Sequence, residues 1–441
     1  MSEHFDILVV GAGPAGIAAA VSASASGKRV GLVDDNPAPG GQIWRSGASL
    51  GAGARKWLAR LDATPALRLQ GWRVFGHPEH GTLRAECNQD CRDLRFGQLI
   101  LATGARERFL PFPGWTLPNV MGAGALDAMV RGGLHIAGKR VVVAGTGPLL
   151  LAVAAHLSRR GAKIVAICEQ ARLRRFVPFA AHLLKEPAKL LQAAAYSVAT
   201  RGSRFYTGCW PVAATGNEKL ESVTLQRDGK SWDVGCDYLA CGFHLVPNLE
   251  LAVLLGCRIE DGFVATDDLQ RTSSAHVFCA GEPTVIGGVD LALLEGQIAG
   301  LAAAGSKAEA KKLAQRRRRH LGFVRALKDA SALDPQLRKL ATEATLVCRC
   351  EDVSFSALRE HACWRDAKLQ TRCGMGPCQG RICGAATEFL FGWSSALAES
   401  NVRPPVFPAM VSSLGIPHEY TSPDDSLTPA ANSIGNTKET P

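Results

Sequence analysis

One segment near the N-terminus constrains the fold of this chain more than any other. It opens with the apolar run FDILVV at 5–10, and a glycine turn with the spacing GxGxxG follows at Gly11, Gly13 and Gly16. The first glycine permits a tight turn, the second lets the backbone approach a pyrophosphate, and the third lets a helix pack closely on a strand. A second apolar run then ends at Asp34, where an acid binds ribose hydroxyls. The order strand, turn, helix, strand and acid predicts a dinucleotide-binding fold, with the anion at the helix N-terminus.

A second segment of the same kind occupies residues 139–169. Gly145 and Gly147 stand in its glycine turn, and Glu169 ends its second strand. Leu150 replaces the third glycine, so we expect a bulky side chain to impede close packing of helix on strand. The residue after Gly147 is a proline, which removes one N–H group from the loop. We predict a second Rossmann-like fold here, and leave open whether its pocket holds NAD, ATP or nothing.

Composition and charge describe an ordinary globular chain of 441 residues, long enough for several domains. Part of the formal net charge of +10 comes from RRRRH at 316–320, which we interpret as a solvated linker helix. Since no aromatic residues interleave with it, we expect no nucleic-acid partner. The apolar stretch 141–157 contains GTGP, which predicts a strand, a turn and a helix rather than a membrane span. The acidic N-terminal segment carries no secretory pattern, and we expect a cytoplasmic protein with reduced thiols.

Six of the fourteen cysteines crowd into residues 348–383. Cys348 and Cys350 form one close pair, and Cys378 and Cys383 form another. A [2Fe–2S] cluster takes two thiolates on each iron, so two close pairs from distant segments suit it. Interspersed glycines let backbone N–H groups approach cluster sulfides. Tetrahedral zinc also binds four thiolates, although a CxC pair fits its common spacing less well. Spacing alone therefore leaves an iron–sulfur cluster, zinc, and free or redox-active thiols as alternatives.

Further segments carry a family resemblance over residues 5–305. GAGPAG, GGQIW at 40–44, ATGA at 102–105, and AGEPTVIGG with EGQIAG at 280–300 resemble the flavin-contacting segments of the thioredoxin reductase-like flavoproteins, which have two dinucleotide-binding domains. The resemblance implies an α/β chain with two Rossmann-like domains, one inserted in the other. It also implies FAD contacts from Gly11, Gly13, Pro14, Ala15, Gly16, Asp34, Asp35, Gly41, Gln42, Ala102, Thr103, Gly104, Gly281 and Glu282, and contacts to a second nucleotide from Gly145, Gly147 and Glu169.

Two features depart from that family. Glu282 stands where the family has an aspartate that reaches the ribityl and phosphate region of FAD, which lengthens the side chain by one carbon. No CxxC dithiol occurs in the sequence, which argues against a dithiol–disulfide mechanism. The domain organisation that we predict is a discontinuous FAD domain at 1–118 and 246–304, a nucleotide-binding domain at 119–245, a basic helical linker at 305–340, a small and mainly helical [2Fe–2S] domain at 341–400, and a C-terminal extension with a mobile tail at 401–441.

The C-terminal part carries a second resemblance. VCRCEDVSFSAL and TRCGMGPCQGRIC resemble the bacterioferritin-associated-ferredoxin-like [2Fe–2S] domain. More closely, they resemble the version of that domain found in the flavoprotein α subunits of opine oxidases, D-hydroxyproline dehydrogenases, dye-linked L-proline dehydrogenases and hydrogen cyanide synthases. The segment VRPPVFPAMVSSL at 402–414 also resembles the end of those subunits. The resemblance implies cluster ligands at Cys348, Cys350, Cys378 and Cys383. Cys373 falls where the family needs no cysteine, and Cys363 lies on the helix expected between the two cysteine segments. We expect both to be packed thiols, with a role as ligand or substitute ligand as the alternative.

The same resemblance implies an electron-transferring subunit that holds FAD and a [2Fe–2S] cluster. An FAD-dependent, amine-oxidase-like β subunit would oxidise an amino acid, imino acid, opine or glycine. Some members also have FMN at a subunit interface and a small ferredoxin-like γ subunit, and they pass electrons to a quinone or dye. The resemblance further allows attachment to the inner face of the cytoplasmic membrane through partner subunits. We find no catalytic constellation on this chain itself. Two alternatives stay open: a stand-alone NAD(P)H-dependent reductase, and a zinc-binding scaffold with a vestigial flavoprotein fold.

Overall fold

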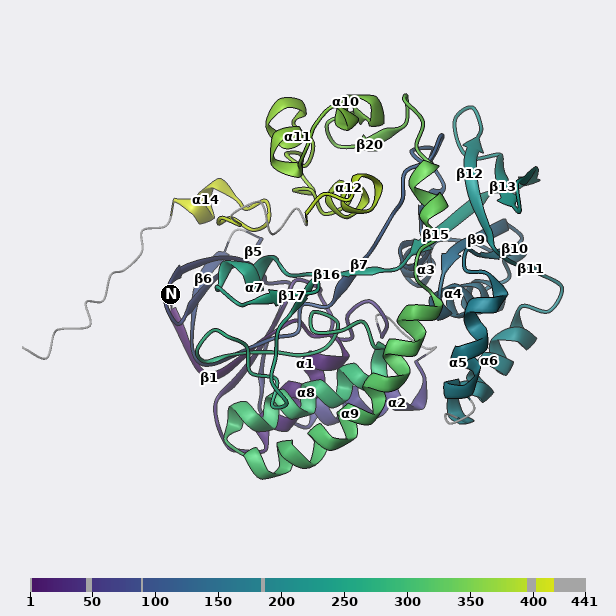
Figure 1. Cartoon of the computed structure of the whole chain (residues 1–441). Coiled ribbons are helices and arrows are strands. Elements are labelled where there is room, and N and C mark those ends of the chain that lie inside the picture. Colours follow the sequence, from purple (N-terminus) through teal and green to yellow (C-terminus); the bar gives the residue numbers. More distant parts are fainter. Residues whose placement is uncertain (1, 45–49, 89, 184–186, 395–401, 416–441) are drawn as a thin grey trace, which may run out of the picture.

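The computed structural model describes residues 2–44, 50–88, 90–183, 187–394 and 402–415. Two α/β units lie next to each other, and a small cysteine-rich unit lies over the crossing between them (Figure 1). This architecture confirms the predicted fold class. The tail predicted to be mobile, from residue 421, lies outside the described residues, and so does the end of the predicted cysteine domain at 395–400.

The first unit is built on a seven-stranded sheet in the order β3-β2-β1-β6-β5-β4, with β19 added to β6. The central strand β1 is parallel to β2 and β6, and its apolar run is buried on both faces, as expected for a central strand of a parallel sheet. The strands are β1 Ser2–Val10, β2 Val30–Asp34, β3 Leu67–Gln70, β4 Arg73–Glu79, β5 Thr82–Cys87, β6 Asp90–Leu101 and β19 Val277–Cys279.

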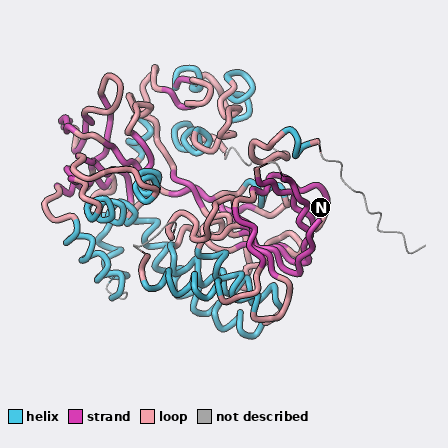
Figure 2. The backbone as a smooth tube through the Cα atoms, turned by 180° about the vertical axis from the view of Figure 1, so that it is seen from behind, coloured by secondary structure: helices cyan, strands magenta, loops and turns pink. Residues whose placement is uncertain are grey.

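Helices cover this sheet, and Figure 2 shows them stacked along one side of it. The closest pair is α1 (Pro14–Ser24) and α8 (Gly288–Ala304). A Cβ atom on Gly296 would lie 2.0 Å from the carbonyl oxygen of Ala15, so only glycine permits this approach. The other elements of the unit are α2 Ala52–Asp62, α7 Glu250–Leu254, β17 Ile259–Glu260, β18 Phe263–Val264 and the long helix α9 Lys307–Ala330.

The second unit has a parallel five-stranded sheet in the order β11-β10-β9-β15-β8 and a separate antiparallel sheet, β12-β13-β14. The apolar stretch 141–157 forms strand, turn and helix, as predicted, and none of the described helices is long and apolar enough to cross a membrane. The elements are β8 Val120–Gly122, α3 Ala123–Arg131, β9 Arg140–Thr146, α4 Pro148–Arg159, β10 Lys163–Glu169, α5 Leu173–Leu183, α6 Pro187–Ala199, β11 Arg204–Thr207, β12 Cys209–Thr215, β13 Ser222–Arg227, β14 Lys230–Gly235 and β15 Tyr238–Phe243.

The chain passes between the two units twice, through a short antiparallel pair of β7 (Ala105–Glu107) and β16 (Leu245–Pro247). After β7 the side chains of Phe109, Phe112 and Trp115 already pack in the hydrophobic core of the second unit. The loop that contains these aromatic residues therefore contacts the second unit before residue 118 and before its first strand, β8, begins. The domain boundaries themselves stay a prediction.

The C-terminal unit is small and mainly helical, as predicted. Its hydrophobic core contains Val347, Leu358, Trp364 and Leu390. It comprises η1 Pro335–Lys339, β20 Leu346–Cys348, β21 Val353–Ser354, α10 Phe355–Arg359, α11 Trp364–Thr371 and α12 Cys383–Phe391, and α14 Val411–Leu414 follows in the C-terminal extension. That extension returns to the first sheet, where the N–H of Val406 donates to the carbonyl of Phe75 on β4 at 2.8 Å.

Candidate flavin and metal sites

The first glycine turn has the geometry of a dinucleotide loop. Gly11 has φ +104°, and a Cβ atom on it would lie 2.3 Å from the carbonyl oxygen of Ala102 at the end of β6. A Cβ atom on Gly16 would lie 1.7 Å from the carbonyl oxygen of Gly11. By contrast, a Cβ atom on Gly13 would meet its nearest neighbour, the Cα of Gly41, only at 4.0 Å. The first and third glycines are thus required by the fold, whereas the second leaves the open approach that a pyrophosphate needs.

Asp34 holds this loop in place. Its buried carboxylate accepts hydrogen bonds from the N–H of Ala12 at 2.5 Å, the N–H of Asn36 at 2.8 Å and the side-chain amide of Asn36 at 2.7 Å. A carboxylate offers about four acceptor positions, so one remains for a ribose hydroxyl. Asp35 and Gln42 are exposed at the same edge of the sheet, and Gly41 faces Gly13.

The other predicted flavin segments meet this loop. Thr103 and Asn248 exchange two hydrogen bonds of 2.8 Å, which fix the turn that continues into Gly104. A Cβ atom on Gly281 would lie 2.8 Å from the Cβ of Ala15, at the start of α1 behind Pro14. Glu282 follows, and burial raises the pKa of its carboxyl, which accepts from the N–H of Ala105. The structure therefore gathers the predicted FAD residues at the carboxyl ends of β1, β2, β6 and β19.

A buried ion pair supports the turn after β19. Glu295 on α8 is fully buried and accepts from the N–H of Gly281 at 2.9 Å and the hydroxyl of Thr284 at 2.6 Å. Arg317 on α9 donates to its other carboxylate oxygen at 2.7 Å. We expected the whole block RRRRH to be solvated, and for Arg317 that expectation is wrong, because its side chain is only 12% exposed. Its buried acidic partner lies twenty-two positions away, outside any local pattern.

Glu169 holds the second glycine turn in the way that Asp34 holds the first. Glu169 accepts from the N–H of Gly147 at 2.7 Å, the hydroxyl of Thr146 at 2.8 Å and the N–H of Ala171 at 2.8 Å, and burial raises the pKa of its carboxyl. Gly145 is required sterically, since a Cβ atom on it would lie 1.9 Å from the carbonyl oxygen of Gly242. Leu150 is buried in the hydrophobic core beside the sheet, so the fold accommodates its side chain, contrary to our expectation.

The end of α9 and the residues after it lie against this second turn. The carbonyl of Ser331 accepts from the hydroxyl of Thr146 at 3.1 Å, and the carbonyl of Ala332 accepts from Gln170 at 3.2 Å and from Arg175 at 2.7 Å. The N–H of Asp334 donates back to Gln170 at 2.9 Å. The linker is thus hydrogen-bonded to residues that flank the second glycine turn.

Five cysteines converge in the C-terminal unit. The sulfurs of Cys348, Cys373 and Cys383 all lie within 4.8 Å of one another, and all three residues are buried. Hydrogen bonds from the thiols of Cys373 and Cys383 lower the pKa of Cys348 far below its usual value. Cys378 hydrogen-bonds with Cys383 and with the exposed Cys350. The structure thus brings the four predicted ligands together, and it adds Cys373, which we had interpreted as a packed thiol.

Glycines shape the loop that carries these thiols. Cβ atoms on Gly374 and Gly380 would lie 2.6 Å and 3.1 Å from the indole of Trp364, and one on Gly376 would lie 2.3 Å from the Cβ of Cys350. The loop can therefore fold tightly over Trp364 and against the CRC segment. A set of converging thiols with backbone N–H groups directed at sulfur fits a thiolate-bound metal centre, either an iron–sulfur cluster or zinc.

A charged network joins this loop to the flavin segments. Arg381 lies between Cys378 and Cys383 in the sequence, and Arg106 on β7 donates to its carbonyl at 3.1 Å. Arg106 also donates to Asn248 at 2.7 Å and pairs with Glu250 at 2.9 Å. The thiol loop is therefore docked on the strand that directly follows the ATGA segment.

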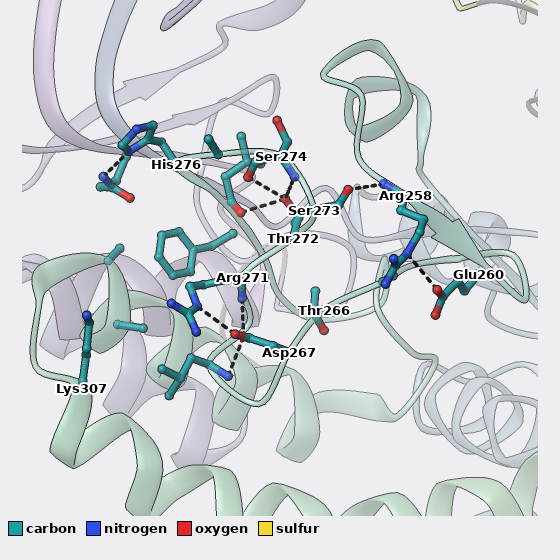
Figure 3. A pocket seen from close by; sticks show the side chains of 18 residues that line it. Arg258, Glu260, Thr266, Asp267, Arg271, Thr272, Ser273, Ser274, His276 and Lys307 are labelled. Carbon is teal, nitrogen blue, oxygen red and sulfur yellow. Dashed lines mark hydrogen bonds and ion pairs between the residues drawn. The ribbon is translucent and has the colours of Figure 1, made fainter.

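A separate cavity of about 950 Å³ lies at the opposite end of β19 (Figure 3). Its charged walls are paired internally, with Arg258 next to Glu260 at 2.8 Å and Arg271 next to Asp267 at 2.8 Å. His276 and Lys307 also line the cavity, together with Gln98 and several serine and threonine residues. None of the predicted site residues lines this cavity, which is therefore separate from both glycine turns.

Fold and site together define a class of oxidoreductase. A flavin-type glycine loop, an inserted second nucleotide-binding fold and converging thiols are the parts of a two-domain flavoprotein with an added metal-binding unit. Residues 5–308 match the family described as "Pyridine nucleotide-disulphide oxidoreductase". The chain is 31% identical to the A subunit of opine oxidase from Agrobacterium tumefaciens, over 95% of this chain and 93% of that protein, and 30% identical to the HcnB subunit of hydrogen cyanide synthase from Pseudomonas aeruginosa, over 85% and 90%. The chain belongs to the pyridine nucleotide-disulphide oxidoreductase family, in the branch that contains these opine oxidase and hydrogen cyanide synthase subunits.

Solved structures agree on the fold. L-proline dehydrogenase from P. horikoshii superimposes with a TM-score of 0.70 at 19% identity, over 94% of this chain and 80% of that one. Thioredoxin reductase from T. acidophilum superimposes with a TM-score of 0.55 at 21% identity, over 69% of this chain and 99% of that one.

Proposed function

We propose that this chain is the electron-transferring flavo-iron–sulfur subunit of a hetero-oligomeric dehydrogenase. A partner of the FAD-dependent, amine-oxidase-like kind would oxidise an amino acid, imino acid, opine or glycine, and the electrons would pass through this chain to a quinone or dye. The observation that carries the proposal is the docking of the thiol loop on β7 through Arg106, next to the predicted flavin segment. Relatives of nearly full length are named as subunits of oxidases and of hydrogen cyanide synthase.

FAD would be held by the first glycine turn. Gly13 leaves room for the pyrophosphate, the helix α1 offers its free N–H groups, and Asp34 retains one acceptor position for the ribose. Glu282 and Gly281 lie on the turn that Glu295 and Arg317 support. When bound, flavin supplies the exchange between electron pairs and single electrons that an iron–sulfur centre requires.

The metal centre would be a [2Fe–2S] cluster on the thiols of the C-terminal unit. The predicted ligand set of Cys348, Cys350, Cys378 and Cys383 is supported by two observations: Cys348 and Cys383 belong to the group of three sulfurs within 4.8 Å of one another, and Cys378 hydrogen-bonds with Cys383 and Cys350. Zinc on the same thiols is the second candidate, since the same donor set suits it. FMN at a subunit interface, association with the cytoplasmic face of the membrane through partners and a small ferredoxin-like subunit stay part of this proposal.

The alternative of a stand-alone NAD(P)H reductase finds less support. It needs a working second glycine turn, and there Leu150 replaces the third glycine and the carbonyl of the linker residue Ser331 accepts from the hydroxyl of Thr146. We therefore expect electrons to enter from a partner rather than from a nicotinamide nucleotide.

The test is to purify the chain with the products of its neighbouring genes and to determine flavin, iron and sulfide per chain. We expect flavin together with about two irons and two inorganic sulfides. Zinc at one per chain without iron would support the scaffold alternative. A complex that carries neither flavin nor iron would overturn the proposed function.

A further inference from the structure

We propose that Cys373 is a fifth thiolate of the metal site and can bind the iron in place of Cys350. This inference rests on the proposed function, since it requires a thiolate-bound centre in the C-terminal unit. A [2Fe–2S] cluster takes four protein ligands, and the structure gathers five thiols. One thiol is therefore in excess whichever four bind, and the burial of Cys373 and the exposure of Cys350 indicate which two compete.

The position of Cys373 is that of a ligand. Its sulfur lies within 4.8 Å of the sulfurs of both Cys348 and Cys383, two members of the predicted ligand set. These three residues come from separate segments, namely the end of β20, the turn after α11 and the start of α12. Because a thiol packed only for its volume has no reason to converge on two other sulfurs, this arrangement favours a role at the centre.

Cys350 has the opposite environment. It is exposed, whereas Cys348, Cys373 and Cys383 are buried. Its Cβ atom lies against Gly376, where an added Cβ atom would approach it to 2.3 Å. An exposed thiolate is the ligand most open to oxidation or alkylation. Among the predicted ligands, Cys350 is thus the one most accessible to oxidants and alkylating reagents in the solvent.

The exchange involves no change of oxidation state at the iron. An alkylating reagent would convert the Cys350 thiolate into a thioether, which would no longer hold iron as a thiolate. The thiol of Cys373 would release its proton to solvent, and its thiolate would replace that of Cys350. Cys348, Cys378 and Cys383 would hold the centre as before. The predicted consequence is a centre that survives damage to its exposed ligand.

Single and double variants test this exchange through metal content and spectra. We expect Cys350→Ser and Cys373→Ser each to retain at least about 70% of the wild-type iron and sulfide, and the double variant to retain less than about 10%, as a site with only three thiolates would. Cys350→Ser should also show shifted visible bands and shifted g values after reduction, because a different thiolate binds.

Cys363→Ser is the matched control, since Cys363 lies outside the convergent group, and it should leave the spectra unchanged. Loss of iron from Cys350→Ser to the level of the double variant would overturn the inference, and so would a double variant that keeps its iron.

Alkylation of the loaded wild-type protein avoids any question of folding. Iodoacetamide should label Cys350 in the intact protein, as mapped by mass spectrometry, while the visible absorption of the centre persists with shifted bands. Bleaching in step with labelling of Cys350 would contradict the inference. A wild-type protein that contains no iron would instead defeat the proposed function, so the two failures are distinguishable.

Discussion

One carboxylate oxygen of Glu250 lies between two guanidinium groups, 2.9 Å from Nη1 of Arg106 and 3.4 Å from Nε of Arg381. Arg106 belongs to the strand that follows the predicted flavin turn, and Arg381 belongs to the loop between two predicted metal ligands. Each of the three side chains is less than one-fifth exposed. Glu250 therefore joins the flavin unit to the thiol loop electrostatically.

Replacing Glu250 with glutamine should loosen this junction. The substitution leaves two facing guanidinium groups without their counter-charge, and breaking such a buried pair costs about 3 kcal/mol. Hydrogen exchange of the amides in 376–383 should rise accordingly. Glu260→Gln is the control, because the Arg258–Glu260 pair is exposed and worth about 0.5 kcal/mol. Equal exchange in both variants would show that Glu250 does not hold the loop.

The first glycine turn separates folding from flavin binding. Gly16→Ala should yield little folded protein, since the new methyl would lie 1.7 Å from a carbonyl oxygen. Gly13→Ala meets no atom closer than 4.0 Å and should fold normally, yet bind FAD at least about 100-fold more weakly because the methyl occupies the pyrophosphate approach. Gly53→Ala, with open space around it, is the control. Normal FAD content in Gly13→Ala, determined after gel filtration, would place the cofactor elsewhere.

The pair of Arg317 and Glu295 predicts a dependence of stability on pH. Burial raises the pKa of Glu295 above 4.5, whereas Arg317 lowers it. A raised pKa means that the stabilising contribution is complete below about 4.5 and is lost as pH rises through the folded-state pKa. Arg317→Met should raise that pKa further, so the variant should lose about 3 kcal/mol relative to wild type at pH 8 and less at pH 5.

Thermal release of flavin at the two pH values measures this difference. Arg318→Met serves as the control, because Arg318 pairs with Asp268 at the surface, and it should behave like wild type at both. A gap between Arg317→Met and wild type that does not change with pH would contradict the role we assign to the pair.

Nicotinamide nucleotides should not reduce the bound flavin. The acid of the second turn accepts hydrogen bonds from Gly147, Thr146 and Ala171, and the linker covers the hydroxyl of Thr146. Anaerobic mixing with NADH or NADPH in a stopped-flow instrument should leave the flavin absorbance unchanged, whereas dithionite should bleach it. Bleaching by either nucleotide within seconds would favour the stand-alone reductase.

The sequence predicted the parts of this fold that depend on local signals. The glycine turns after β1 and β9 could be placed because strand, turn, helix and acid follow one another within about thirty residues. The thiol segment could be recognised from its own spacing. The sequence could not predict the ion pairs of Arg317, Arg381 and Glu250. Their partners lie far away in the chain, and a single charged residue belongs to no periodic pattern that would indicate its partner. Cys373 is buried in the core of the C-terminal unit, as expected of a packed thiol. Its proximity to Cys348 and Cys383 could not be predicted, because the convergence of three segments is a tertiary property.

The most direct test of the central claim is an anaerobic titration of the purified complex with candidate amino acids, followed by visible absorption and electron paramagnetic resonance. The account predicts that one substrate bleaches the flavin and produces the signal of a reduced [2Fe–2S] centre, and that both changes disappear when the partner subunit is omitted. Reduction of the isolated chain by the amino acid itself, or flavin bleaching in the complex with no iron–sulfur signal, would contradict it.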